Sequence, residues 1–256
     1  MIRSFPQMTE NFQQMTNKQQ IIALFNTNVR GVEICLDGQN IKHCGKEGHW
    51  LETKMGIKHN AQNAPDILGY EMKTGSKVTT FMDKAPDKMY IDGNVMPKRN
   101  KALKTHFWYK YASIKESLEP TIGGWSIDKY NKSGQKLTVD SFNNVSVLYD
   151  YQHDHRENKE HLGLNTKPHI IMQWDALSLL KSIEDKFNSK GFFKCAKEHN
   201  HFAKICFGQK INFDTWIDAL KKGDIYHDGY SKLNGRGRHV FRASNKFWDD
   251  LIIEEY

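Results

Sequence analysis

The 256-residue sequence lacks the long apolar runs of membrane-spanning helices. No stretch approaches the roughly 18 consecutive apolar residues of such a helix, and the amino-terminal segment MIRSFPQMTENFQQM has no secretory apolar core. Cysteine is also scarce: the residues Cys35, Cys44, Cys195 and Cys206 are too few for a disulfide scaffold. We therefore expect a cytoplasmic protein without membrane association, with its thiols reduced.

The sequence has a surplus of positive charge. Lys and Arg number 37 against 30 Asp and Glu, which gives a formal net charge of +7 and a pI near 9.0. A positive surface favours a polyanionic partner such as nucleic acid, because bound Lys and Arg release counterions from phosphates. The same surplus is common in proteins that bind no polyanion, so charge alone leaves both interpretations open.

The order of predicted elements indicates a mixed α/β fold without internal repeats. Helices are predicted over 9–27, 45–55, 175–187 and 214–222, and from 245 onward. Strands are predicted at 67–73, 77–82, 144–151 and 169–174, with strand pairs around 197–200 and 231–237. The turn signal Thr74-Gly75-Ser76 predicts a β-hairpin of 67–73 and 77–82. The apolar stripe predicted for the helix over 175–187 consists of Leu177, Leu180, Ile183 and Phe187.

The sharpest chemical signal is Asp66 after Pro65, followed four residues later by Glu71-Met72-Lys73. Side chains alternate along a strand, so Glu71 and Lys73 project to one face, and Asp66 can approach the same point from the preceding bend. The two carboxylates and the Met72 carbonyl oxygen are ligands suited to Mg²⁺, and Lys73 can orient an attacking water. This grouping suits phosphodiester hydrolysis. An exposed strand with a solvated Glu/Lys face is the alternative, and the apolar neighbours disfavour it.

A longer pattern around this motif resembles a known group of enzymes. The string Gly45-Lys46-Glu47-Gly48-His49-Trp50-Leu51-Glu52, followed by Asp66 and Glu71-Met72-Lys73-Thr74, resembles the PD-(D/E)xK nucleases of the MutH-like branch. That branch includes the nicking enzyme MutH and restriction endonucleases of the MvaI, BcnI and LlaMI types, and residues 49–74 look most like the LlaMI type. The resemblance implies that Glu52 joins Asp66, Glu71 and Lys73 in the active site of a catalytic core at 45–82.

The resemblance also implies a fold and a reaction. The fold is a restriction-endonuclease-like α/β fold with a central mixed sheet flanked by helices, as one nuclease domain over 1–256, with one lobe or with two lobes around a DNA cleft. The reaction is that of a type II restriction endonuclease, which hydrolyses both strands of a short specific double-stranded DNA site with Mg²⁺ and leaves 5′-phosphates. A cognate DNA methyltransferase is an expected partner in the same system, without a stable complex.

Two other functions stay open on the sequence. A MutH-like nicking or repair endonuclease would cut one strand and depend on partner proteins, whereas a non-catalytic DNA-binding protein would keep the carboxylates as remnants. The recognition sequence, the cut position, the role of residues 86–168 and the choice between monomer and dimer do not follow from the sequence.

The segment from Gly235 to Arg242 (GRGRHVFR) is the best candidate for DNA contact. Arginine can donate two parallel hydrogen bonds to guanine O6 and N7, and glycine lets the backbone approach the duplex. The segment lies in the predicted DNA-recognition region, 214–244, which resembles the corresponding part of the MvaI group and makes Arg242 the closest match to a base-reading arginine. For Arg236, Arg238 and His239 two alternatives stay open. They contact base edges, or they contact phosphates alone and position the protein without reading sequence. A second basic stretch either contacts the DNA backbone or is simply exposed to solvent; it contains Lys98, Arg99, Lys101 and Lys104.

Two histidine-containing patterns are not expected to carry chemistry. His199-Asn200-His201 spells the HNH nuclease motif, but it lies at a predicted hairpin tip. The spacing of Cys195, His199, His201 and Cys206 matches no zinc arrangement that we recognise. We expect two hairpin strands with buried thiols and a polar turn instead.

Overall fold

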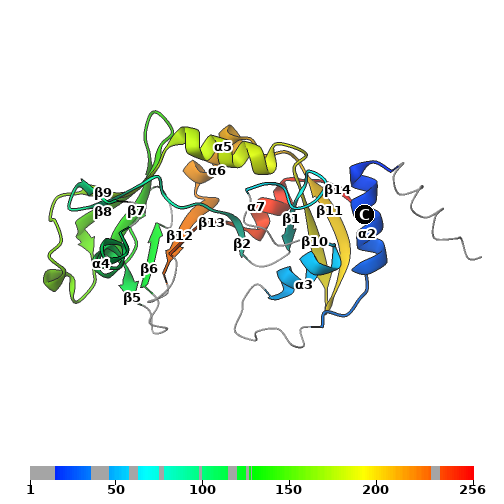
Figure 1. Cartoon of the computed structure of the whole chain (residues 1–256), viewed down its shortest axis with the longest axis horizontal. Coiled ribbons are helices and arrows are strands. Elements are labelled where there is room, and N and C mark those ends of the chain that lie inside the picture. The colour runs from blue at the N-terminus through cyan, green and yellow to red at the C-terminus, as the bar shows by residue number, and fades with distance from the viewer. Residues whose placement is uncertain are drawn as a thin grey trace, which may run out of the picture. The chain divides into compact units, whose positions relative to one another are not determined.

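The computed structural model describes residues 15–35, 46–57, 63–74, 78–97, 100–114, 120–124, 127, 129–231 and 237–256. The chain divides into two compact units, drawn from blue to red along the sequence in Figure 1. The described parts of Met1–Lys77, Ile183–Ile211 and Trp248–Tyr256 form unit 1, and those of Val78–Ser182 and Asn212–Phe247 form unit 2. Within these described parts, no helix is both long and apolar enough to span a bilayer.

Unit 1 is built on a four-stranded mixed sheet in the order β1-β10-β11-β14. The strands are β1 (Glu71–Thr74), β10 (Phe192–Glu198), β11 (His201–Gly208) and β14 (Ile252–Glu255). β1 runs parallel to β10, and the other two pairings are antiparallel. Parallel neighbours need a long connection, and here the chain between β1 and β10 includes the Val78–Ser182 part of unit 2.

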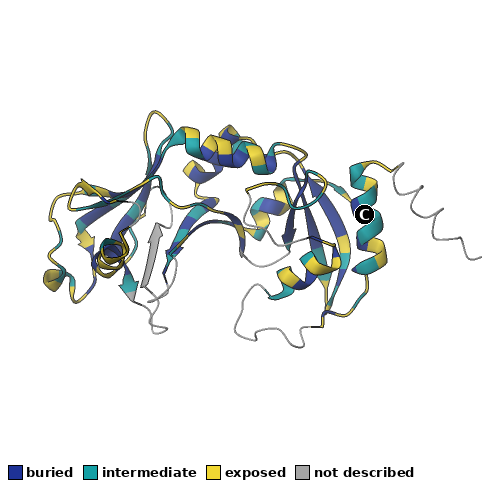
Figure 2. Ribbon diagram, in the orientation of Figure 1, coloured by how far each residue is buried: buried dark blue, intermediate teal, exposed yellow. Residues whose placement is uncertain are grey.

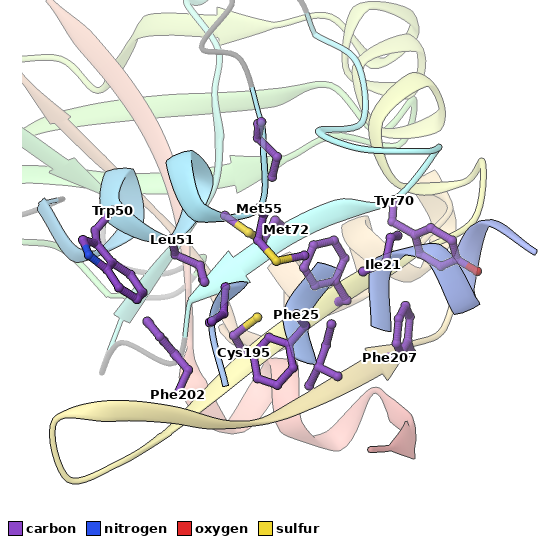
Figure 3. Close-up of a cluster of buried hydrophobic side chains, with 14 of the residues drawn as sticks. Ile21, Phe25, Trp50, Leu51, Met55, Tyr70, Met72, Cys195, Phe202 and Phe207 are labelled. Carbon is purple, nitrogen blue, oxygen red and sulfur yellow. The ribbon is translucent and has the colours of Figure 1, made fainter. Parts of the chain in front are cut away.

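Two helices pack on one face of this sheet, α2 (Asn17–Asn28) and α3 (Lys46–Lys54). Buried side chains from both helices form one apolar cluster with strand residues that include Met72 and Cys195 (Figure 3). The helical members are Ile21, Phe25, Trp50 and Leu51, and the strands also supply Phe193, Phe202, Ile205 and Phe207. Burial of this apolar surface fixes α3 against β1.

The opposite face of the sheet is covered by the end of α5 (Ala176–Phe187) and by α7 (Asn245–Asp250). The Trp248 ring lies 5.0 Å from the Phe192 ring and 6.1 Å from the Phe187 ring, centroid to centroid. Because side chains alternate on β1, Met72 points into the first cluster while Glu71 and Lys73 share the second face. The sequence predicted this shared face correctly.

The ends of α2 and α3 have local causes in the sequence. α2 begins at Asn17, because the Thr16 hydroxyl accepts from the Gln19 backbone N–H and the Gln19 side chain accepts from the Thr16 backbone N–H. The predicted start at residue 9 lies outside the described residues. α3 agrees with the predicted helix and is followed by Gly56, whose φ of 72° suits the end of a helix.

Unit 2 contains two five-stranded sheets, with the orders β2-β13-β12-β6-β5 and β4-β3-β9-β8-β7. The first comprises β2 (Val78–Asp83), β5 (Ser113–Ile114), β6 (Pro120–Gly124), β12 (Ile225–Tyr230) and β13 (Arg238–Ser244). The second comprises β3 (Lys88–Ile91), β4 (Asn94–Val95), β7 (Ser133–Val139), β8 (Val145–Asp154) and β9 (His169–Trp174). The helices are α4 (Lys101–Tyr111), α6 (Phe213–Lys222) and the 3-10 turn η1 (Lys159–Leu162). Most residues of β8 are buried, whereas buried and half-buried residues alternate along β12 (Figure 2).

The predicted hairpin of 67–73 and 77–82 is wrong. β1 pairs with β10, whereas β2 pairs with β13 in a different sheet. The turn signal at residues 74–76 marks where β1 ends, but it carries no information about the partner of the next strand. Glu71, Met72 and Lys73 are all buried, which is typical of a strand covered on both faces rather than of an exposed hairpin.

The predicted stripe of α5 is also partly wrong. Leu177 is 81% exposed and Leu180 is 40% exposed, while Leu179, Ile183 and Phe187 are fully buried. The buried residues are therefore spaced four apart. The buried face of α5 differs from the face predicted from Leu177 and Leu180, which are spaced three apart.

A buried histidine lies in the core of unit 2. The His227 ring on β12 lies 5.0 Å from the Trp174 ring and 5.5 Å from the Phe241 ring, and neither of its nitrogens has a hydrogen-bond partner among the described residues. Burial lowers the pKa of His227 well below its ordinary value of 6.5, and the neighbouring His239 lowers it further.

We expect the contribution of His227 to the unfolding free energy to fall as the pH drops below 6.5, because only the unfolded chain then protonates His227. The loss from this residue approaches roughly 1.4 kcal/mol per pH unit until the folded-state pKa is reached. Urea unfolding at pH about 7.5 and about 5.5 measures it. His227→Phe, which has no proton to gain, should show a smaller pH dependence, and an equal one would contradict the assignment.

Candidate active site

A tight turn places Asp66 beside β1. Ile67 and Tyr70 exchange two backbone hydrogen bonds of 3.1 and 2.8 Å. The two residues between them have positive φ, 51° at Leu68 and 87° at Gly69, as a type I′ turn requires. The turn reverses the chain, so the Met72 backbone N–H donates to Asp66 Oδ2 at 2.8 Å.

Glu71 receives two ammonium groups on the same carboxylate oxygen. Lys73 Nζ donates to Glu71 Oε1 at 2.9 Å, and Lys186 Nζ at the end of α5 lies 3.0 Å from that oxygen. Glu71 Oε2 is buried and has no hydrogen-bond partner among the residues that the structure describes. A buried carboxylate oxygen without a donor is costly unless a cation binds it, so Oε2 fits a metal ligand.

Lys73 is enclosed by aromatic rings. Its Nζ lies 5.3 Å from the Phe187 ring centroid and 5.2 Å from the Trp248 centroid, which allows cation–π attraction. Burial lowers the pKa of Lys73 below its ordinary value, the Glu71 charge opposes this shift, and the Lys186 charge adds to it. A lysine with a lowered pKa releases its proton more readily than an exposed one.

Asp66 has the opposite perturbation. Burial raises the pKa of Asp66 to about 6, the negative charge of Glu71 raises it further, and the Met72 N–H lowers it. The influence of Glu71, Lys73 and Lys186 on this pKa indicates that all four groups share one site.

The donor set suits a cation that keeps water ligands. Within the described ranges no group of three or more His, Cys, Asp or Glu residues is arranged to hold a metal ion. Asp66 and Glu71 provide a carboxylate pair, and Mg²⁺ is usually bound through one or two carboxylates with several waters retained. Met72 points its side chain into the core, so only its backbone carbonyl can contribute a ligand.

Glu52 lies on α3 and is half-buried. Its Oε2 atom is 3.2 Å from His49 Nδ1. A Cβ atom at Gly48 would lie 3.9 Å from Thr74 Cγ2, so α3 approaches β1 directly after Lys73. Residues four apart share one helix face, and Glu52 is therefore on the side of α3 that meets β1.

The predicted DNA-contact residues occupy different environments on β13. Arg238 is exposed, with its Nε 2.6 Å from Asp83 Oδ2, and Arg242 Nε donates to Asp228 Oδ2 at 2.7 Å. His239 is buried against Trp108, so its side chain does not reach solvent. Arg236, Lys98 and Arg99 lie outside the described residues. Val240 is also buried, so Arg238 and Arg242 are the basic side chains that β13 leaves at least partly exposed.

Sequence reasoning missed Lys186, Phe187 and Trp248. Each is brought to Glu71 or Lys73 by tertiary packing, from a segment more than a hundred residues further along the chain. A lysine in the last turn of a helix is ordinary in sequence, because it also interacts favourably with the helix dipole. The local sequence therefore does not distinguish a lysine that pairs with Glu71 from an ordinary lysine at a helix end.

The hairpin of β10 and β11 agrees with the prediction of buried thiols and a polar turn. His199 lies in the turn with a φ of 55°, while Cys195 and Cys206 are buried. Cys195 pairs with Ile205, and Lys194 pairs with Cys206, so the thiols point to opposite faces. Burial raises the pKa of the Cys195 thiol, which keeps it protonated.

Comparisons with known proteins agree with this architecture. The model of the LlaMI restriction endonuclease family matches residues 29–256. The chain is 31% identical over 268 residues to the type II restriction enzyme ScrFI of Lactococcus lactis subsp. cremoris, covering 93% of this chain and 98% of that protein. It also resembles the structure of a restriction endonuclease MvaI–cognate DNA substrate complex, with a TM-score of 0.59 and 14% identity over 100% of this chain and 99% of that one. The predicted fold, with a mixed sheet flanked by helices, is confirmed.

Proposed function

Because the chain belongs to the LlaMI restriction endonuclease family, it is a site-specific endodeoxyribonuclease of the type II restriction class, and we propose that Asp66, Glu71 and Lys73 form its catalytic centre. Family membership gives the reaction but assigns no residue. The observation that supports this assignment is the Glu71 carboxylate, with one oxygen paired to lysines and the other buried without a partner among the described residues.

Asp66 and Glu71 would hold the divalent metal ion that type II restriction endonucleases generally use, here Mg²⁺, together with the Met72 carbonyl. When bound, Mg²⁺ stabilises negative charge on the phosphate and promotes deprotonation of the attacking water. Asp66 Oδ1 and Glu71 Oε2 accept no hydrogen bond from the described part of the chain, and they suit this ligand set because Mg²⁺ prefers carboxylate oxygens and water.

Lys73 holds and transfers a proton at Nζ in this proposal. The ammonium balances phosphate charge, and its lowered pKa favours release of the proton, after which Nζ can orient the attacking water and accept its proton. Phe187 and Trp248 limit the movement of Nζ. Glu52, on the face of α3 that meets β1, assists the attacking water.

The products would be 5′-phosphate and 3′-hydroxyl ends on both strands of double-stranded DNA. We expect purified protein with Mg²⁺ to convert unmodified plasmid into discrete linear fragments, whose sequenced ends share one short site. Nicked circles only, or cutting only after partner proteins are added, would support the MutH-like alternative. No product at any Mg²⁺ concentration, with metal-insensitive DNA binding, would support the non-catalytic one. The Asp66→Ala protein is the matched control for contaminating nucleases.

DNA is read, in this proposal, from β13 in the region 214–244. Arg242 contacts a base, because Asp228 holds its Nε and leaves the terminal amino groups for guanine O6 and N7. Arg238 contacts phosphate from its exposed position, and the same role is assigned to Arg236, which lies outside the described residues. The burial of His239 gives it a supporting role beneath the strand rather than a direct contact.

Arg242→Ala is expected to weaken binding to the cleavage site by roughly 1–3 kcal/mol, about 10- to 100-fold, and to leave binding to random duplex nearly unchanged. Fluorescence anisotropy in Ca²⁺ measures both affinities. Arg238→Ala should weaken the two equally, because a phosphate contact carries no sequence information. An equal loss in Arg242→Ala would contradict the base-reading role.

The family suggests where this activity operates. We place it in the cytoplasm, with a DNA methyltransferase of the same specificity as the expected partner, without a stable complex between the two. Membership in a restriction endonuclease family supports both proposals.

A further inference from the structure

We propose that Lys186 is a positioning residue for the reaction, which orients the Glu71 carboxylate so that Oε2 stays open to the metal ion. The inference rests on the proposed function of Glu71. Lys186 would not touch substrate; it acts through Glu71.

The arrangement of donors around Glu71 is asymmetric. Lys186 Nζ and Lys73 Nζ lie 3.0 and 2.9 Å from Oε1, and Oε2 receives no hydrogen bond from any described residue. A carboxylate can accept donors on both oxygens. Placing both ammonium groups on one oxygen therefore fixes which oxygen faces away from the lysines.

Lys73 alone does not fix the orientation of Glu71. It lies on the same strand and supplies one hydrogen bond to Oε1, about which the carboxylate can still turn. Lys186 comes from a different element, the last turn of α5, and its side chain is 20% exposed against 7% for Lys73. A donor from a second element approaches Oε1 from another direction, so Lys186 restrains the carboxylate in a way that Lys73 alone does not.

Lys186 can affect metal affinity in two opposite ways. If it acted only through its positive charge, it would repel the cation and weaken metal binding. A positioning residue instead strengthens metal binding, since ligands oriented by outer partners bind metals roughly 10- to 100-fold better than unsupported ones. Metal affinity therefore separates the two roles by its direction.

The test is calorimetric titration of Ca²⁺ into the complex of the full chain with a duplex that carries the cleavage site. We expect Lys186→Met to weaken Ca²⁺ affinity about 10-fold or more, and Lys186→Arg to stay within about threefold of wild type. Lys181→Met is the matched control, an exposed lysine on the same helix without an ion pair in the described part of the chain, and should match wild type. Unchanged or tighter Ca²⁺ binding by Lys186→Met overturns the proposal. If Lys186→Met fails to fold, loss of Ca²⁺ affinity in a folded Lys186→Arg protein overturns it.

Asp66→Ala, measured in parallel, separates this inference from the proposed function. If Asp66→Ala loses Ca²⁺ binding and Mg²⁺-dependent cleavage while Lys186→Met behaves as wild type, only the role of Lys186 fails. If Asp66→Ala retains both, the assigned catalytic centre is wrong, and the role of Lys186 fails with it.

Discussion

Lys73→Ala is expected to slow DNA cleavage by roughly 10²- to 10⁴-fold, the usual contribution of a positioned proton-transfer group. The methyl side chain removes both the proton carried at Nζ and the charge that faces Glu71 Oε1 at 2.9 Å. Single-turnover cleavage of a site-containing duplex at saturating enzyme and Mg²⁺ measures the chemical step. Affinity for the same duplex in Ca²⁺ should change little, because Lys73 is buried and makes its described contacts inside the protein.

Lys194→Ala provides the matched control for Lys73→Ala. Lys194 pairs with Lys73 across the β1–β10 ladder and is similarly buried, but it forms an ion pair with Asp249 instead of Glu71. Its loss should lower stability and leave the cleavage rate near wild type. A fully active Lys73→Ala protein, or two variants with equal loss of cleavage, would contradict the assigned role.

Asp66→Asn is expected to abolish measurable cleavage while stabilising the metal-free protein at pH about 8. The amide cannot bind metal as a carboxylate does, although its oxygen can still accept from the Met72 N–H. Burial raises the pKa of Asp66 to about 6, so the ionised side chain destabilises the folded protein. The neutral Asn side chain has no such cost. Loss of function with a gain in stability is typical of a group held ionised for catalysis.

The pH dependence of this stability difference has a definite sign. Between the ordinary pKa near 3.8 and the folded value of about 6, the unfolded chain binds fewer protons than the folded one. The contribution of Asp66 to wild-type stability therefore falls through this window as pH rises, and the advantage of Asp66→Asn grows to on the order of 1–3 kcal/mol above it. Urea unfolding in EDTA at pH about 8 and about 4.5 measures both ends. A less stable Asp66→Asn protein at the higher pH would contradict the perturbed pKa.

The local part of the site was predictable from sequence, because its members are close in the chain. Asp66, Glu71 and Lys73 lie within eight residues, so strand alternation and one bend bring them together. Lys186 and Trp248 were not predictable, because they depend on how α5 and α7 pack on the sheet. Neither residue differs in its local sequence from an ordinary helix-end lysine or core tryptophan.

Dependence on tertiary packing also explains why the predicted hairpin and part of the predicted stripe of α5 were wrong. The segment after Thr74 has strand character, and β2 is indeed a strand, but the pairing partner of β2 is β13. Strand pairing between distant segments is decided by packing of the whole unit, which periodicity does not encode. The exposure of Leu177 has a similar origin, because apolar spacing alone does not determine which side of α5 meets the core.

Anomalous scattering from crystals of the protein–DNA complex soaked with Mn²⁺ gives the most direct test of the catalytic centre. The assignment predicts a peak in coordination contact with a carboxylate oxygen of both Asp66 and Glu71, while Lys73 and Lys186 remain on Glu71 Oε1. A peak bound by other carboxylates, with Glu71 Oε2 left unbound, would contradict it.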